Sequence, residues 1–493
     1  MRRRKSMRRF VTAMIVYGWM LASNGGAQLW KGSLFHPGNQ RAEGPTSNAI
    51  NAILAADGVW IGTGKELLHT TDGGATWRRF TSQNGLGRGA VSAIAGRNGT
   101  VWVATAVDSM TPSGVFPAGT GLSRTTDGGL TWQWVPQPVD DPQETRYKPT
   151  TTVIQNLTYD IAVTEEAVWI ASWGGGLRRS ADGADWEVVT VDGQLFDALG
   201  FLTHVVFSVY FDGEALWVGS AGGIHRTTDE GETWATFSHQ NQEEPISGNF
   251  VVAIAHQELD QGKRIWASTV EAVDTSETRA LSYSDNNGQS WSVTLQGEFV
   301  HNMAFHSGGT VYAVSGNGLF ASQDAFEWTR FPQIYDTQTG EGLYTTNMYS
   351  VGVETPYRIY LGSNDGLAVS PDGGVTWTVH RAFAVPGEGG NPDTYAYPNP
   401  FSPMQHNRVG GDGYVRFQYR ITRASSVSVH IYDFSMRLVR TAVKDRQRTA
   451  PGSYSEVWDG RNDVGEPVAN GVYFYRIRLS EGKTLWGKVM VVN

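Results

Sequence analysis

Acidic residues are the side chains in this sequence best suited to chemistry, and they gather in its long loops. Asp140, Asp141 and Glu144 lie close together in one loop, and other loops carry Asp197, Glu243, Glu244, Asp336 and Glu341. Glycoside hydrolysis requires two carboxyl groups flanking the bond that is cleaved, and a pair from this set would supply them. The alternative is that these acids are only solvated, as most charged loop residues are. We assign no catalytic residue.

Aromatic residues occur in or near the same loops, at Tyr147, Trp173, Phe196, Phe201, Tyr335 and Tyr344. Exposed rings beside carboxylates suit sugar rings or peptide segments. The alternative is that each ring packs its own loop. We predict a binding site that uses Tyr147, Trp173, Tyr335, Tyr344, Asp140, Asp141 and Glu144.

No pattern in the sequence indicates a metal site or a cofactor. There is no cysteine, the eleven histidines are scattered, and H-E-x-x-H is absent. Residues 459–465 resemble a calcium loop but lack its closing glutamate. No P-loop, G-x-S-x-G or Rossmann fingerprint occurs where it would need to. We therefore expect no metal, no cofactor, and a binding protein rather than an enzyme.

A repeated phrase indicates how these loops are positioned. It reads Thr-Thr-Asp-Gly-Gly-Ala-Thr-Trp at residues 70–77 and recurs at intervals of 38 to 57 residues, about one four-stranded propeller blade each. Two of the seven copies are one residue short, and one has Asn in place of Asp. The recurring pairs are Asp72 and Trp77, Asp127 and Trp132, Asp182 and Trp186, Asp229 and Trp234, Asn286 and Trp291, Asp324 and Trp328, and Asp372 and Trp377.

Each copy, called a repeat turn below, predicts a tight turn between two strands. A short carboxylate can accept bonds from backbone N–H groups two or so residues later, and glycine permits positive φ. The Trp is a large apolar plug. We expect the Asp to be a buried structural acceptor, because a catalytic carboxylate has no reason to recur in every repeat.

The phrase S/T-x-D-x-G-x-T-W resembles the Asp-box of sialidases, sortilin-type receptors, xyloglucanases and photosystem II assembly factors, over about residues 47–382. The resemblance implies a β-propeller but no particular activity. Sialidases of this kind have an early R-I-P triplet, which is absent here. Xyloglucanases use two propellers around a cleft, and only one is expected here.

Four strands recur in each repeat and predict an all-β, seven-bladed β-propeller over residues 28–383. The first strand is an apolar run, as at residues 300–305, which we expect to be buried on both faces. The second has an aromatic second residue, as in VWIGT at 59–63. Several long loops, including 106–120, 136–155, 190–203 and 332–347, fall on one rim, where we predict a binding surface. The alternative is that these loops are inert.

Residues 1–27 have the layout of a secretory signal peptide. A basic start is followed by a short apolar core at 10–22 and small residues at 25–27. The alternative is an uncleaved anchor. No later apolar run is long enough to cross a bilayer, and a net charge of −9 without a basic stripe argues against a nucleic-acid partner. We expect export through the periplasm to the outer surface or the medium.

After a linker at 384–394, residues 395–493 predict a small Ig-like β-sandwich. This part contains YPNPF at 397–401, WDG at 458–460 and GVYFY at 471–475. With these motifs it resembles the Ig-like domain of flagellar hook-capping proteins and, more closely, the C-terminal sorting domain of type IX secretion substrates. The usual Gly of one turn is Met436 here. The resemblance implies that secretion machinery reads this domain; the alternative is an accessory domain that stays attached. The matching motifs include Pro398, Asn399, Pro400, Trp458, Asp459, Gly460, Gly471 and Tyr473.

Three functions are therefore considered. The main hypothesis is an exported, non-catalytic propeller that binds a polysaccharide or an envelope protein at its long-loop rim. The rivals are a glycoside hydrolase that uses a rim carboxylate pair and a periplasmic assembly scaffold.

Overall fold

The computed structural model describes residues 44–272, 274–354 and 357–493, so the predicted signal peptide at 1–27 lies outside the described residues. The protein is all-β: the helices in the described part of the chain are two 3-10 turns, η2 (Ser82–Asn84) and η3 (Leu202–His204). No helix in those three ranges is both long and apolar enough to span a membrane.

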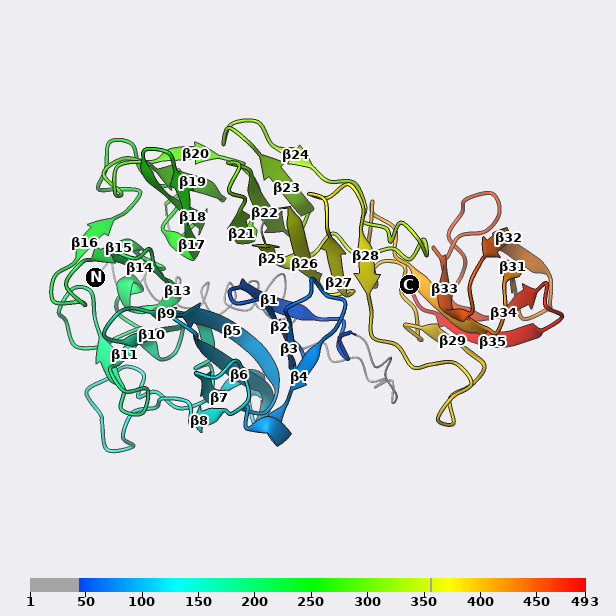
Figure 1. Ribbon diagram of the computed structural model, residues 1–493, viewed down its shortest axis with the longest axis horizontal. Helices are drawn as coiled ribbons and strands as arrows, with labels where there is room; N and C mark the ends of the chain where they lie inside the picture. The colour runs from blue at the N-terminus through cyan, green and yellow to red at the C-terminus, as the bar shows by residue number, and fades with distance from the viewer. Residues whose placement is uncertain (1–43, 273, 355–356) are drawn as a thin grey trace. The chain divides into compact units, whose positions relative to one another are not determined.

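Four-stranded sheets of sequence-consecutive strands make up residues 50–380 (Figure 1). Their strands are β1 (Ile50–Ala55), β2 (Val59–Thr63), β3 (Leu67–Thr70), β4 (Arg78–Phe80); β5 (Ala90–Arg97), β6 (Thr100–Thr111), β7 (Gly114–Thr125), β8 (Gln133–Val135); β9 (Thr158–Val163), β10 (Val168–Ser172), β11 (Gly176–Ser180), β12 (Glu187–Val189); β13 (Val206–Phe211), β14 (Leu216–Ser220), β15 (Gly223–Thr227), β16 (Ala235–Phe237); β17 (Phe250–Leu259), β18 (Gly262–Val270), β19 (Ala280–Ser284), β20 (Ser292–Thr294); β21 (Val300–Phe305), β22 (Val311–Ser315), β23 (Gly318–Ser322), β24 (Thr329–Arg330); and β25 (Met348–Glu354), β26 (Arg358–Ser363), β27 (Leu367–Ser370), β28 (Thr378–His380).

In each of these four-stranded sheets the second strand has a larger buried fraction than the first. Every residue of β2, β10, β14 and β22 is buried, whereas β1 and β21 are mostly half-buried. The prediction that the first strands are buried on both faces was therefore wrong for these strands. The physical reason is position: the first strand is an edge of its sheet, whereas the second lies between two strands and under neighbouring sheets.

The sheets form a closed ring, a β-propeller, because apolar cores lie between neighbours and also between the first sheet and the last. Trp60, Val91 and Val103 share one core between the first two sheets. Ile50 and Ile61 of the first sheet pack with Tyr360 of the last. The Ser350 hydroxyl donates to the carbonyl of Ile50 at 3.4 Å, which links strands that are 300 residues apart in sequence.

One predicted rim loop is a β-hairpin. Residues 106–120 were expected to be irregular, but β6 and β7 continue through them and stay paired from Ala106 with Gly119 to Thr111 with Gly114. Turn residues at 112–114 and the alternation of Val107, Ser109 and Thr111 allow the strands to extend beyond the sheet. The rim therefore carries a rigid projection in place of a loop.

The C-terminal strands form a β-sandwich of two sheets. One has the order β29 (Thr394–Tyr397), β30 (Val415–Ile421), β33 (Gly452–Trp458), and the other has β32 (Leu438–Arg448), β31 (Ser425–Tyr432), β34 (Gly471–Leu479), β35 (Thr484–Val491). Alternate side chains of both sheets fill one core. Phe417 and Tyr475, from opposite sheets, lie 4.3 Å apart between ring centroids.

The chain divides into two compact units that do not follow the predicted domain boundaries in every detail. The first contains Ser47–Phe331 and Asn347–Gly374, and the second contains Pro332–Thr346 and Val375–Asn493. The segment Pro332–Thr346, which follows β24 in sequence, thus groups with the sandwich.

Candidate binding surface

Four segments of the propeller unit are hydrogen-bonded into one surface, called the rim surface below: the β6–β7 hairpin, residues 136–157, the β10–β11 turn and residues 190–205. Gln155 N–H donates to the carbonyl of Pro117 at 2.8 Å, and Gly174 N–H donates to the carbonyl of Gln155 at 3.1 Å. Lys148 N–H donates to the carbonyl of Phe196 at 3.1 Å. These backbone bonds hold long loops in one arrangement, which a binding surface requires.

Exposed apolar side chains are the chemical feature of this surface. Met110 at the hairpin is 87% exposed, and Leu195 and Leu199 are each 49% exposed. The same segments expose Val115, Val139, Val153 and Phe201. Single exposed apolar residues are ordinary, but several on neighbouring, mutually bonded segments are typical of a surface that binds another molecule.

A buried ion pair connects one segment of the rim surface to the sheet. Asp140 and Arg178 are both buried, and Arg178 Nη2 donates to Asp140 Oδ1 at 2.6 Å. The other carboxylate oxygen accepts from Thr151 N–H at 2.6 Å. Asp140 was expected to be an accessible rim acid, but both of its oxygens are used internally. Its role in this structure is to anchor residues 136–157 to β11.

The other predicted residues of this loop are also engaged. Asp141 is exposed and accepts from Gln143 N–H at 2.8 Å, which forms a local turn. Glu144 binds the guanidinium of Arg146, whose hydrogen bonds hold the pKa of Glu144 below its usual value. Tyr147 packs edge-on against buried Phe196, with ring centroids 5.9 Å apart.

Trp173 is half-buried against an apolar cluster beneath the rim surface. The cluster includes Val205, Phe207, Phe250 and Val270. Tyr147 and Trp173 therefore contribute to loop packing, the alternative raised for the aromatic residues, and the exposed aliphatic residues were not foreseen. Met110 could have been found from the strand-like alternation of residues 106–111; nothing in the pattern of residues 195–199 distinguishes them from a packed loop.

Acid–base catalysis needs a carboxyl group with a raised pKa. Burial raises the pKa of Asp160 to about 7, but its two oxygens accept from Ile161 N–H and from Val209 N–H of the next sheet, at 2.9 and 3.1 Å. Asp160 thus bridges β9 and β13. Desolvation raises the pKa of Asp108, on β6 opposite Pro117, to about 6.

Among the described residues, no group of three His, Asp or Glu side chains is arranged to hold a metal ion.

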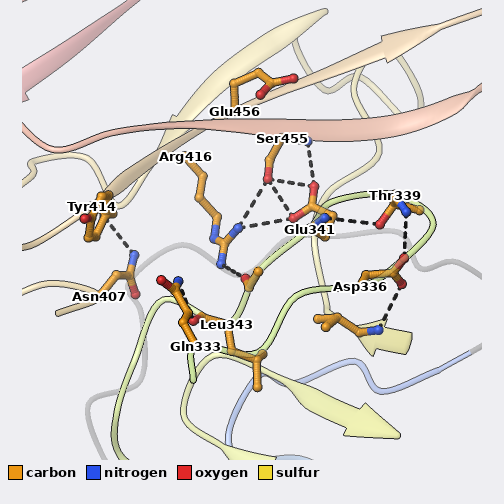
Figure 2. Close-up of polar contacts among 12 residues, drawn as sticks. Gln333, Asp336, Thr339, Glu341, Leu343, Asn407, Tyr414, Arg416, Ser455 and Glu456 are labelled. Carbon is orange, nitrogen blue, oxygen red and sulfur yellow. Dashed lines mark hydrogen bonds and ion pairs between the residues drawn. The ribbon is translucent and has the colours of Figure 1, made fainter. Parts of the chain in front are cut away.

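Four predicted rim residues, Tyr335, Asp336, Glu341 and Tyr344, belong to the sandwich unit. Figure 2 shows the polar contacts of Asp336 and Glu341. Glu341 Oε1 accepts from both the N–H and the hydroxyl of Ser455, at 2.8 and 2.7 Å. Arg416, which is 1% exposed, donates to Glu341 at 3.2 Å and to the Gly342 carbonyl at 2.7 Å. Segment 332–346 is therefore held on the faces of β30 and β33 by a buried ion pair.

The other predicted residues of segment 332–346 also make their contacts within the sandwich unit. Tyr344 packs on Tyr414 at 4.7 Å, with the Arg416 guanidinium 4.8 Å from its ring centre. Buried Asp336 accepts from Val379 N–H at 3.0 Å. Tyr335 is 43% exposed and donates its hydroxyl to Gln333 at 2.7 Å. The sequence offered no signal that Arg416 and Ser455 would pair with Glu341, since about 75 and 114 residues separate them from it.

The repeat turns share one hydrogen-bond pattern. Asp72 Oδ1 accepts from the Thr70 hydroxyl at 2.8 Å and from Thr76 N–H at 2.9 Å, while Oδ2 accepts from the Thr76 hydroxyl at 2.5 Å. Asp127 and Asp229 repeat these contacts. Hydrogen bonds from threonine lower the pKa of all three aspartates to about 2. The side chains are exposed and not buried as expected, because the turn places them at the surface.

Asn286 and the two short copies keep the turn by different means. Asn286 Oδ1 accepts from Ser290 N–H at 3.0 Å, and its amide donates to the Ser290 hydroxyl at 2.9 Å, which reverses one bond of the Asp pattern. Asp182 accepts from the backbone N–H groups of Ala184 and Asp185. Asp324 accepts from those of Phe326 and Glu327. Asp372 accepts from the Ser370 hydroxyl at 2.9 Å.

The repeat-turn tryptophans lie between sheets. Trp132, Trp234 and Trp328 meet Trp60, Trp169 and Trp266 of the preceding sheet edge-on, at centroid distances of 6.0, 6.5 and 6.3 Å. Trp77, Trp186, Trp291 and Trp377 are likewise half-buried or buried. Gly231 has φ +90°, and a Cβ there would lie 3.0 Å from Trp169, so glycine is required at that position.

The predicted motif residues of the sandwich are structural. Asn399, between Pro398 and Pro400, exchanges hydrogen bonds with the backbone of β35 at Lys488 and Met490. Trp458 donates to the Arg461 carbonyl at 2.8 Å, and Asp459 accepts from Arg461 N–H at 3.0 Å.

Glycine and tyrosine complete this part of the core. Gly460 has φ +72°, and a Cβ there would lie 2.8 Å from Pro403. Gly471 begins β34, and the Tyr473 hydroxyl donates to the Ala469 carbonyl at 2.9 Å. Met436, in place of the usual glycine, adopts φ +60°, the left-handed conformation that glycine favours.

Comparison with known proteins agrees with this description of the sandwich. Residues 405–483 match the family model of the FlgD Ig-like domain, so this part of the chain is Ig-like. No curated protein matches the chain.

Solved structures that the chain resembles include three propeller proteins. PorZ, an essential bacterial surface component of the type-IX secretion system of Porphyromonas gingivalis, is 14% identical over 88% of this chain and 69% of PorZ, with a TM-score of 0.40. YCF48 from Cyanidioschyzon merolae is 16% identical over 67% of this chain and 97% of YCF48, with a TM-score of 0.43. An ancestral GH74 enzyme is 13% identical over 91% of this chain and 64% of the enzyme, with a TM-score of 0.46. At these values the resemblance does not extend to function.

Proposed function

We propose that this protein is an exported, non-catalytic binding module whose rim surface recognises a protein of the cell envelope. The observation that carries the proposal is the set of exposed aliphatic side chains, led by Met110, Leu195 and Leu199, on segments that backbone bonds hold in place. Aliphatic groups favour a protein partner over a polysaccharide, because sugar binding relies on stacked rings and polar groups. Two of the predicted rim acids are paired internally, Asp140 with Arg178 and Glu144 with Arg146.

The proposal also includes the number of blades and the boundaries of the domains. Residues 28–383 would form a seven-bladed Asp-box propeller, in which the repeat-turn Asp and Trp residues are structural. Residues 384–394 would be a linker, and residues 395–493 a domain that secretion machinery reads. Residues 1–27 would be the signal peptide. The family match to an Ig-like domain and the closed ring of four-stranded sheets support these assignments.

Site-specific photo-crosslinking in cells tests the rim surface. A photoreactive residue placed at Met110 or Leu195 is expected to trap a discrete partner. Matched controls at Leu130 and Phe326, which are 76% and 74% exposed on repeat turns, are expected to trap none. Equal labelling at all four positions, or labelling at the controls alone, would contradict the proposal.

A glycoside hydrolase is the second candidate, in which Asp108, an exposed carboxyl on β6 of the rim hairpin with a pKa raised to about 6, would be the general acid. The test is reducing-end release by the purified protein from sialylated glycans and from plant and microbial polysaccharides. Release that is lost in Asp108→Asn would establish hydrolysis. A periplasmic scaffold, the third candidate, would require that the protein stays in the periplasm with residues 395–493 intact, which fractionation measures.

A further inference from the structure

The outer face of the sheet β32–β31–β34–β35 has an unusual composition for a sandwich. Side chains that point away from the core in adjacent strands are paired across it: His430 with Arg476 and Trp486, and Tyr432 with Phe474 and Lys488. Outer faces of sandwiches ordinarily carry mixed polar residues. Here three aromatic rings and two cations occupy neighbouring positions of the two rows, with no carboxylate among them.

Stacking fixes the arrangement of this face. The guanidinium of Arg476 lies over both Tyr432 and Trp486, at 5.3 and 5.7 Å from the ring centres. The two rings are themselves 5.7 Å apart. Trp486 nevertheless remains 48% exposed. Rings and a planar cation held side by side form a rigid, flat and amphipathic platform.

Most cations of the sandwich are paired with carboxylates, whereas those of this face are not. Residues 395–493 contain 14 Lys and Arg against 8 Asp and Glu, whereas the whole chain has 39 against 48. Eight of the 14 are paired with carboxylates. Arg476, Arg478 and Lys488 form no ion pair within the described ranges. Burial, and then the charges of Arg476 and Arg478, lower the pKa of His430.

From these observations we propose that this outer face binds an anionic polysaccharide, one whose sugars carry carboxylate groups. Ring faces accommodate sugar rings, and unpaired guanidinium and ammonium groups accept the carboxylates. An acidic peptide fits less well, because the backbone groups of β31 and β34 are already paired on both sides and offer no strand addition. The site uses no residue of the rim surface and does not rest on the function proposed for it.

Affinity electrophoresis of the purified protein tests this site. Polygalacturonate in the gel is expected to retard the protein, and neutral dextran is not. The double variant Arg476→Gln/Lys488→Gln and the single variant Trp486→Ala are each expected to weaken retardation about tenfold, since charge-assisted and stacking contacts are each worth roughly 1–3 kcal/mol. The charge-matched control Arg408→Gln/Arg423→Gln, outside this face, is expected to bind as the parent protein does.

Three results would overturn the proposal. They are absence of retardation by a folded protein, equal losses in the control variant, and equal retardation by poly-L-glutamate, which would assign the face to acidic proteins. The near-ultraviolet circular dichroism of each variant shows whether the sandwich is folded. Because the rim residues are unchanged in all variants, crosslinking at Met110 reports on the rim independently.

Discussion

The propeller and the sandwich differ in where some of their aromatic and charged residues lie. In the propeller unit Trp60, Trp169 and Trp217 lie between sheets and are almost fully buried. In the sandwich, Tyr432, Phe474 and Trp486 form part of an outer face that also carries unpaired cations. The same residue types thus stabilise a repeated fold in one unit and form an accessible surface in the other. Position in the sheet decides the role, not residue type.

The largest expected effect is the loss of an inter-sheet tryptophan. Trp169→Ala removes a side chain that is 0% exposed, and we expect the free energy of unfolding of the propeller to fall by about 3–5 kcal/mol. Trp486→Ala, on the outer face of the sandwich, is expected to change stability by less than about 1 kcal/mol. Urea unfolding followed by circular dichroism measures both. Similar losses in the two variants would remove the contrast between the units.

The ion pair of Figure 2 is expected to rank second. Glu341→Gln leaves the buried Arg416 without its carboxylate partner, which should destabilise the sandwich unit by about 2–3 kcal/mol. Glu388→Gln is the matched control: its pair with Arg420 has both side chains about half exposed, so we expect a change below about 0.5 kcal/mol. Thermal unfolding of the two variants measures these changes. Equal shifts in melting temperature would show that the burial of Arg416 does not increase the contribution of its ion pair to stability.

Asp160 is expected to make the stability of the propeller fall as pH rises. Its folded-state pKa, about 7, lies above the ordinary value of 3.8, so the unfolded chain loses this proton first and stability falls as pH rises from about 4 to about 7. The loss should be on the order of 4 kcal/mol and absent in Asp160→Asn. Urea unfolding at pH 4.5 and pH 8 measures it. An unchanged pH dependence in the variant would assign the effect to another group.

The repeat-turn aspartates are expected to give a pH dependence of the opposite sign at lower pH, measured by urea unfolding between pH 2 and pH 5. The lowered pKa of Asp72, about 2, means that its contribution is present above pH 4 and is lost as pH falls toward 2. Asp72→Asn should therefore differ from the parent protein chiefly above pH 4, which separates its effect from that of Asp160.

The smallest expected effect is a gain of stability at one sandwich turn. Met436 has φ +60°, so Met436→Gly relieves backbone strain and should stabilise the sandwich by about 0.5–1 kcal/mol. Met404→Gly is the control, because Met404 is exposed and does not have positive φ; it should be neutral or destabilising. A lower melting temperature for Met436→Gly would contradict the strain argument.

Most of the strands could be predicted from sequence patterns that span only a few residues. The repeat turns and the aromatic second strands recur with enough regularity that the strands were placed within one or two residues at most positions, as with residues 300–305 and β21. The failures lie where a strand continues past its sheet, as in the β6–β7 hairpin, or where burial depends on neighbouring sheets, as in the first strands. The positions of Asp140 and Glu341 could not be predicted for the same reason.

The sequence by itself determined the all-β class, the repeated turn chemistry and the Ig-like segment, because each depends on residues within a few positions of one another. Only the tertiary structure decided which acids are accessible. Asp140 meets Arg178 and Glu341 meets Arg416 across 38 and 75 residues, and no local periodicity encodes such pairings. The tertiary structure likewise decided that Trp169 is enclosed while Trp486 is exposed, since burial depends on the sheets that pack around a residue.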